Sequence, residues 1–251
     1  MRDTYSPPYM NERPIRILFV GVALCGAERQ LFQLATALHA IGHRVRVATI
    51  AQSDLATEFR HVPLRIGNRR SNVGAICGIA GALVRLCMSE RPDVIVGWHT
   101  VPLILGSAVG KYCQTPFVAA IRSSGPEQLS GIYRNGFQCA LLRMSLRTAN
   151  FVVANSQSGI DGYSKLRLIN GVAGICIIRN EMNTSEFQAA SNYTTQAART
   201  ELGVWHHGPL ALNVGRVAVK QDITLLLCAI DATLAVSRNL AGFWQVLNER
   251  N

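Results

Sequence analysis

Short apolar runs alternate with longer amphipathic stretches along most of this chain, and this alternation limits the folds that it can adopt. The runs, in order, are IRILFV, RVRVATI, DVIVGW, PFVAAI, NFVVAN, GICIIR and PLALNV. Most of them are separated by roughly 10 to 18 residues in which apolar side chains recur with helical spacing. Such alternation is typical of βαβ units around a parallel sheet whose two faces are both covered. We therefore predict an α/β fold built on a doubly wound parallel sheet.

A change in composition after the sixth run divides the chain. The segment between the sixth and seventh runs is polar and rich in turn residues. The parts that we expect are a flexible arm over 1–14, a Rossmann-like domain over 15–180, a linker over 181–207 and the start of a second domain over 208–251. The last part provides one strand, a helix over about 222–236 and a short strand in FWQVL, which is too little to close a core. We therefore expect the second Rossmann-like domain to be incomplete.

The charge of the chain is basic, with a formal net charge of +10, and it comes almost entirely from 22 arginines against 3 lysines. The planar guanidinium group suits phosphate and carboxylate oxygens, although a GC-rich coding sequence would produce the same bias. A basic chain also raises the question of nucleic-acid binding. No RRM, KH, zinc-finger or recognition-helix pattern accompanies the charge, so we expect no nucleic-acid partner.

The N-terminus and the cysteines indicate a cytoplasmic protein. The opening MRDTYSPPYMNERP lacks the apolar core of a signal peptide, and the seven cysteines form no CxxC pair, which favours reduced thiols. The apolar stretch 73–88 is too short to span a bilayer and is interrupted by Arg85. Any contact with the inner face of a membrane is therefore expected to be peripheral.

One expected helix, within 133–148, is both basic and amphipathic. It presents Arg143 and Arg147 beside leucine and methionine side chains. Such a helix can lie on an anionic bilayer, but a helix that packs on the core and exposes a solvated basic face explains the pattern more simply.

Several polar residues follow directly after predicted strands. His99 follows DVIVGW and Arg122 follows PFVAAI, at the carboxyl edge where doubly wound sheets bind ligands. A lone histidine at a strand end often has only a structural role. At the first strand-to-helix turn, Gly26 and Glu28 fit a tight turn with a helix cap, and no G-x-G-x-x-G dinucleotide motif is completed there. Ser156 fits the N-cap of a helix better than a binding role.

Five segments of the chain, in order, resemble motifs of family 4 glycosyltransferases, which have two Rossmann-like domains in the GT-B arrangement. The segments are CGAERQLFQLATALHAIGHRVRVATI, GWHTVPLILGSAVGKYCQTPFVAAIRSS, TANFVVANSQSGIDGYSKL, GICIIRNEMNTSEF and ARTELGVWHHGPLALNVGRVAVKQDITLLLCAI. The similarity runs from Arg16 to about Ile230.

This resemblance implies transfer of a sugar from a nucleotide-sugar donor to a hydroxyl of a glycan, polysaccharide or lipid-linked acceptor. It assigns the site residues in three groups: His99 and Arg122 as catalytic residues, Gly26, Ala27, Arg216 and Lys220 as ligands of the donor phosphates, and Cys25 and Glu28 as the acceptor-side loop. The cations would neutralise charge on the departing nucleoside diphosphate, so neither a metal nor a further cofactor is expected.

The sequence also departs from the family pattern. Cys25 stands where the first glycine of a pair is usual, and Arg179, Asn180 and Glu181 replace a Pro-Asn-Gly turn. A pair of glutamates that grips the donor in the family would fall beyond Asn251. We therefore expect little transferase activity from this chain alone. A non-catalytic remnant that binds an acceptor or a partner is the alternative.

Overall fold

The computed structural model describes residues 13–22, 26–50, 61–63, 73–123, 136–180, 195–203, 213–214, 223–236 and 246–247. The chain divides into two compact units, Met1–Glu181 and Met182–Asn251.

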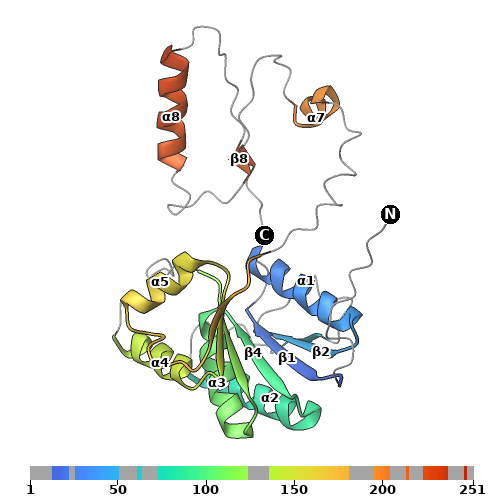
Figure 1. Cartoon of the computed structure of the whole chain (residues 1–251). Helices are drawn as coiled ribbons and strands as arrows, with labels where there is room; N and C mark the ends of the chain where they lie inside the picture. Colours follow the sequence, from blue (N-terminus) through green and yellow to red (C-terminus); the bar gives the residue numbers. More distant parts are fainter. Residues whose placement is uncertain are drawn as a thin grey trace. The chain divides into compact units, whose positions relative to one another are not determined.

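A parallel sheet forms the centre of the first unit (Figure 1). Its strands are β1 (Arg16–Gly21), β2 (Arg44–Thr49), β3 (His61–Pro63), β4 (Val94–Trp98), β5 (Phe117–Ile121), β6 (Phe151–Ala154) and β7 (Ile175–Ile177). Their order is β3-β2-β1-β4-β5-β6-β7, and every described pairing is parallel. The order reverses at β1, which confirms the predicted doubly wound sheet.

Helices cover the two faces of this sheet unequally (Figure 1). The helices are α1 (Gly26–Ala40), α2 (Val73–Glu90), α3 (Thr100–Cys113), α4 (Gly136–Arg147) and α5 (Gln157–Lys165). Buried residues of α1 pack with one face of β1, β2, β4 and β5. Buried residues of α2, α3, α4 and α5 form a second, larger core on the other face. The apolar runs are therefore buried on both sides, as their lack of alternation predicts.

Helix α3 packs closely on the sheet because glycines lie at its interface. A Cβ added at Gly97 of β4 would lie 2.7 Å from the Cα of Leu103, and one at Gly106 would lie 2.8 Å from the ring of Phe117. A Cβ at Gly110 would lie 3.0 Å from the carbonyl oxygen of Thr115. Larger side chains at these three positions would push α3 away from β4 and β5.

None of the strands predicted from the sequence corresponds to β3. It has three residues and pairs with β2 at the edge of the sheet, from Val47–His61 to Thr49–Pro63. A run this short shows no recognisable period, and proline is tolerated at a sheet edge.

The basic amphipathic helix packs against the core of the first unit. In α4, Leu142 and Leu146 are fully buried against the larger core, and a guanidinium nitrogen of Arg143 donates a hydrogen bond to the carbonyl oxygen of Leu166 at 3.2 Å. Arg147 is exposed. This packing favours the interpretation of α4 as a core helix with a solvated basic face.

The second unit contains α7 (Thr195–Glu201), β8 (Asn213–Val214), α8 (Ile223–Val236) and β9 (Val246–Leu247), and β8 pairs in parallel with β9. Helix α8 matches the helix expected over 222–236, and β9 lies inside FWQVL. Helix α7 lies inside the segment for which a linker was expected. The side chains of Leu225 and Leu227 on α8 are 64% and 50% exposed.

Two further expectations concern membranes and thiols. Within the described residues, no helix combines the length and the apolar character that crossing a bilayer requires. The six cysteines that the structure describes are free thiols.

Candidate functional site

The carboxyl ends of four adjacent strands bring the candidate site together. His99 follows β4, Arg122 follows β5, Asn155 and Ser156 follow β6, and Arg179 lies just beyond β7. The strands are neighbours in the order β4-β5-β6-β7, and all run in the same direction. These residues therefore share one edge of the sheet, where ligands of α/β folds bind.

The backbone of His99 is strained. Its φ of 72° and ψ of 170° fall in a region that is otherwise almost restricted to glycine, at a cost of about 1 to 3 kcal/mol. The residue serves as the N-cap of α3 without a side-chain capping bond, and its carbonyl oxygen accepts a 2.8 Å hydrogen bond from the N–H of Leu103. Its Nε2 atom is buried. Strain of this kind is concentrated at functional sites.

The guanidinium group of Arg122 stacks on an aromatic ring. Its Cζ lies 3.9 Å from the ring centroid of Trp98, which is only 2% exposed and meets Phe19 edge-on at a centroid distance of 6.2 Å. Burial lowers the pKa of Arg122 to about 10, so the group remains a cation at neutral pH. Stacking occupies the faces of the guanidinium plane and leaves its N–H donors in that plane for a ligand.

A cavity of about 310 Å³ lies beside this stack. Its lining comes from α1 and from the ends of four strands, and consists of Gln30, Gln33, Leu34, Ala37, Trp98, Arg122, Val153, Ile178 and Arg179. Two cations and two amides thus border an apolar floor. This combination suits a ligand that carries hydroxyl or anionic groups.

Polar groups of α5 and of its N-cap contact the segments that follow the strands at the candidate site. The hydroxyl oxygen of Ser156 accepts a 3.2 Å hydrogen bond from the N–H of Gly159, which confirms the N-cap interpretation of Ser156. On α5, burial raises the pKa of Tyr163, while contact with the hydroxyls of Ser123 and Thr100 opposes that rise. Tyr163 thereby links α5 to the residues that follow Arg122 and His99.

The structure describes only some of the predicted site residues. His99 and Arg122 lie at one edge, as expected. Gly26, Ala27 and Glu28 form the first turn of α1, but their side chains lie outside the described part of the chain. Cys25, Arg216 and Lys220 lie outside the described residues altogether.

Of the nine residues that line the cavity, sequence reasoning assigned a site role only to Arg122. The polar and aromatic residues that it missed are Trp98, Arg179, Gln30 and Gln33. Trp98 precedes His99 and Arg179 follows the run GICIIR, so their positions at strand ends were available signals. The two glutamines lie one helical turn apart on α1, and only the packing of α1 against the sheet brings them to the cavity.

The sequence profile described as Glycosyltransferase Family 4 matches residues 25–178, which is more than half of the chain. The chain belongs to Glycosyltransferase Family 4. Every described residue of the cavity lining except Arg179 lies within the matched range. No curated protein sequence shows a significant match.

Several solved structures share the fold of this chain. The Anabaena protein HepE, in complex with UDP-glucose, is 19% identical with a TM-score of 0.64, over 91% of this chain and 59% of HepE. Sucrose-phosphate synthase from Thermosynechococcus elongatus is 18% identical with a TM-score of 0.64, over 88% of this chain and 60% of the synthase. A glycosyltransferase from Rickettsia africae is 16% identical with a TM-score of 0.58, over 95% of this chain and 69% of the Rickettsia protein.

These likenesses establish a Rossmann-like fold of the GT-B type. The chain spans about 60% of the length of HepE and of the synthase.

Proposed function

We propose that this chain takes part in moving a sugar from a nucleotide-sugar donor to an acceptor hydroxyl. The observation that carries the proposal is the stack of Arg122 on Trp98 beside the strained His99, at the carboxyl edge of the sheet in a member of Glycosyltransferase Family 4. The complexes of HepE with UDP-glucose and with UDP support a nucleotide-sugar as the donor.

The acceptor side would be the cavity along α1. Arg122 and Arg179 offer charged N–H donors, and Gln30 and Gln33 offer amides that can both donate and accept. Such groups can orient the hydroxyls of a glycan and hold an anionic group on a lipid-linked one. In this arrangement Arg122 stabilises negative charge near the reacting atoms, and the imidazole of His99 contacts the sugar.

The donor phosphates would be bound at the turn that begins α1. The N–H groups of Gly26 and Ala27 belong to the first turn of a helix, where backbone donors favour phosphate oxygens. Arg216 and Lys220 would neutralise charge on the leaving nucleoside diphosphate, and Cys25 and Glu28 would border the acceptor. Two cations can supply this stabilisation without a bound metal.

A calorimetric titration of the purified chain with UDP tests the proposed donor-phosphate site. We expect binding that weakens about tenfold or more in Arg216→Ala, the usual effect of losing a charged hydrogen bond. Arg85→Gln, which removes an exposed arginine of α2 outside the cavity, is the matched control and should leave the affinity unchanged.

The alternative function, a non-catalytic domain that binds an acceptor or a partner, gives a different result. It predicts no binding of UDP and no release of UDP from UDP-sugars, while glycan binding persists and depends on Arg122. UDP binding that is equally strong in wild type and Arg216→Ala would reject the proposed role of Arg216.

A further inference from the structure

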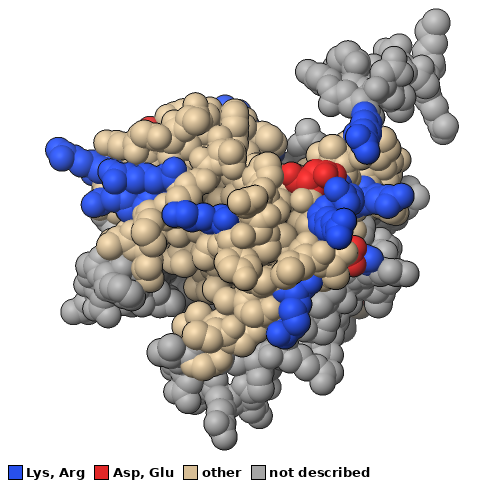
Figure 2. All heavy atoms as spheres, turned by 90° about the horizontal axis from the view of Figure 1, so that it is seen from below, with Lys and Arg blue, Asp and Glu red and all other residues tan. Residues whose placement is uncertain are grey.

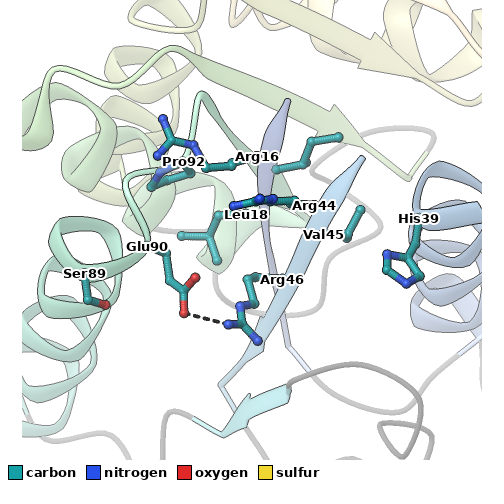
Figure 3. Close-up of a pocket in the computed structure, with 10 residues that line it drawn as sticks. Arg16, Leu18, His39, Arg44, Val45, Arg46, Ser89, Glu90 and Pro92 are labelled. Atoms are coloured by element: carbon teal, nitrogen blue, oxygen red, sulfur yellow. Dashed lines mark ion pairs between the residues drawn. The ribbon is translucent and has the colours of Figure 1, made fainter. Parts of the chain in front are cut away.

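A second cavity, of about 560 Å³, lies at the opposite edge of the same sheet (Figure 3). Its residues come from the amino ends of β1 and β2 and from the ends of α1 and α2. Three arginines line it: Arg16, Arg44 and Arg46. Arg16 pairs with Arg44 across the two strands and Leu18 pairs with Arg46, so all three side chains start from the same face of the sheet.

Two of these arginines have carboxylate partners. A guanidinium nitrogen of Arg16 lies 2.9 Å from a carboxylate oxygen of Asp93, and one of Arg46 lies 3.0 Å from a carboxylate oxygen of Glu90. The hydrogen bonds from Arg16 lower the pKa of Asp93 to about 2, so this carboxylate is ionised at neutral pH.

Arg44 makes no ion pair within the described part of the chain, and it lies directly opposite Arg16. Three cations against two carboxylates leave an excess of one positive charge (3 − 2 = 1). Like charges directly opposite one another on neighbouring strands are destabilising. An anion in the cavity would remove that repulsion.

The walls of the cavity strengthen its attraction for an anion. Leu18 and Pro92 lie beside the arginines, and apolar walls of low dielectric focus the field of nearby charges. Each guanidinium has five N–H donors, so the paired arginines keep donors for a ligand. Figure 3 shows His39 on the other side of β2 from Arg46 and Glu90, which leaves the arginines as the main donors.

The surroundings of the cavity are also basic. Figure 2, which views the molecule from below, shows many lysine and arginine side chains and few acidic ones on that face. A volume of 560 Å³ is far larger than one phosphate ion and lies within the range of small-molecule sites. It would therefore admit a phosphate group together with the molecule that carries it.

We propose that the cavity at the amino ends of β1 and β2 binds a phosphate-bearing anion, with Arg44 as its main ligand and Arg46 and Arg16 as further donors. The tetrahedral oxygens of phosphate accept from several guanidinium groups at once. The phosphate would belong either to a small molecule or to a lipid headgroup. This site lies at the sheet edge away from His99 and Arg122, so it does not depend on the proposed transferase function.

The test measures binding of inorganic phosphate to the whole chain at constant ionic strength. In the wild type, phosphate should raise the unfolding temperature and bind measurably by calorimetry. Arg44→Gln should weaken this binding about tenfold or more and remove most of the temperature shift. Arg85→Gln removes the same charge from an exposed position of α2 and should behave as the wild type.

The stability of the unliganded variant separates binding from a structural role. Without phosphate, Arg44→Gln should unfold at the same or a higher temperature than the wild type, because it removes repulsion from Arg16. A lower unfolding temperature would mean that Arg44 contributes to the fold, and it would overturn the proposal. Unchanged phosphate binding in Arg44→Gln, or an equal loss in Arg85→Gln, would overturn it as well.

Vesicles distinguish the two sources of phosphate. Flotation with phosphatidylcholine vesicles that contain phosphatidylglycerol, compared with phosphatidylcholine alone, measures attachment to anionic headgroups. Arg44-dependent flotation supports the site with a headgroup as ligand, and Arg44-dependent binding of free phosphate without flotation supports a small-molecule ligand. Absence of both overturns the proposal.

Discussion

Replacing His99 by glycine and by alanine should reveal how much backbone strain the protein maintains at its candidate site. Both substitutions remove the imidazole, so in the folded protein they differ in how well the new residue tolerates φ 72° and ψ 170°. Glycine adopts this conformation without steric cost, whereas alanine retains a strain of about 1 to 3 kcal/mol.

The size of the difference follows from two opposing effects. Glycine also has more freedom in the unfolded chain, which costs roughly 0.5 to 1 kcal/mol relative to alanine. His99→Gly should therefore be more stable than His99→Ala by up to about 2 kcal/mol, although at ordinary positions alanine is the more stable. For a protein of this size, a difference of about 2 kcal/mol corresponds to roughly 4 to 8 °C in unfolding temperature.

Thermal unfolding followed by circular dichroism measures the two variants in parallel, and urea unfolding provides free energies from the same samples. If His99→Ala proves more stable than His99→Gly, the residue does not hold the strained backbone, and the argument that links its geometry to function fails.

Four further predictions follow from the described contacts. Gly97→Ala should cost about 1 to 3 kcal/mol in thermal unfolding, because its Cβ would lie 2.7 Å from a backbone atom of α3, whereas Gly78→Ala, with nothing within 4 Å, should be neutral or stabilising. In a version of the chain joined to a complete donor-binding domain, Arg122→Gln should lower kcat/KM by roughly 10- to 1,000-fold in a UDP-release assay, and Arg122→Lys should not restore it, because lysine lacks the planar fork. Arg16 lowers the pKa of Asp93 from 3.8 to about 2. The ionised carboxylate therefore stabilises the folded protein above about pH 4, and this stabilisation is lost as the pH falls toward 2. Asp93→Asn should remove that part of the pH dependence when unfolding is measured as a function of pH. Treatment with EDTA should leave UDP binding unchanged, and a loss reversed by Mg²⁺ would contradict metal-independent binding.

The central strands were predictable because each carries an unbroken apolar run, and a parallel sheet covered on both faces requires such runs. The same reasoning could not find β3, whose pairing depends on the edge that β2 offers rather than on its own three residues. Helix α4 was predicted from its spacing, but the amphipathic pattern could not decide between a bilayer and a core. The burial of Leu142 and Leu146 decides for the core.

The candidate site was predictable only as a set of strand ends. His99 and Arg122 follow apolar runs, and the topology of the sheet then places them at one edge. The stack of Arg122 on Trp98 depends on the register that sets Trp98 beside Ala120, and a sequence does not report register between strands that are distant in the chain. The backbone angles of His99 were equally hidden, because a histidine at that position gives no sign of a positive φ.

Strain at His99 and close packing of α3 are parts of one arrangement. A strained residue persists only where its surroundings hold it more strongly than the strain can relax. Here the chain passes from Gly97, which touches Leu103 of α3, through His99 into the first turn of that helix, and Gly106 holds the helix against Phe117. Any substitution that lifts α3 from the sheet would give His99 room to relax, because His99 is the N-cap of that helix. The glycines of this interface therefore contribute to the geometry of the candidate site, although none of them lines its cavity.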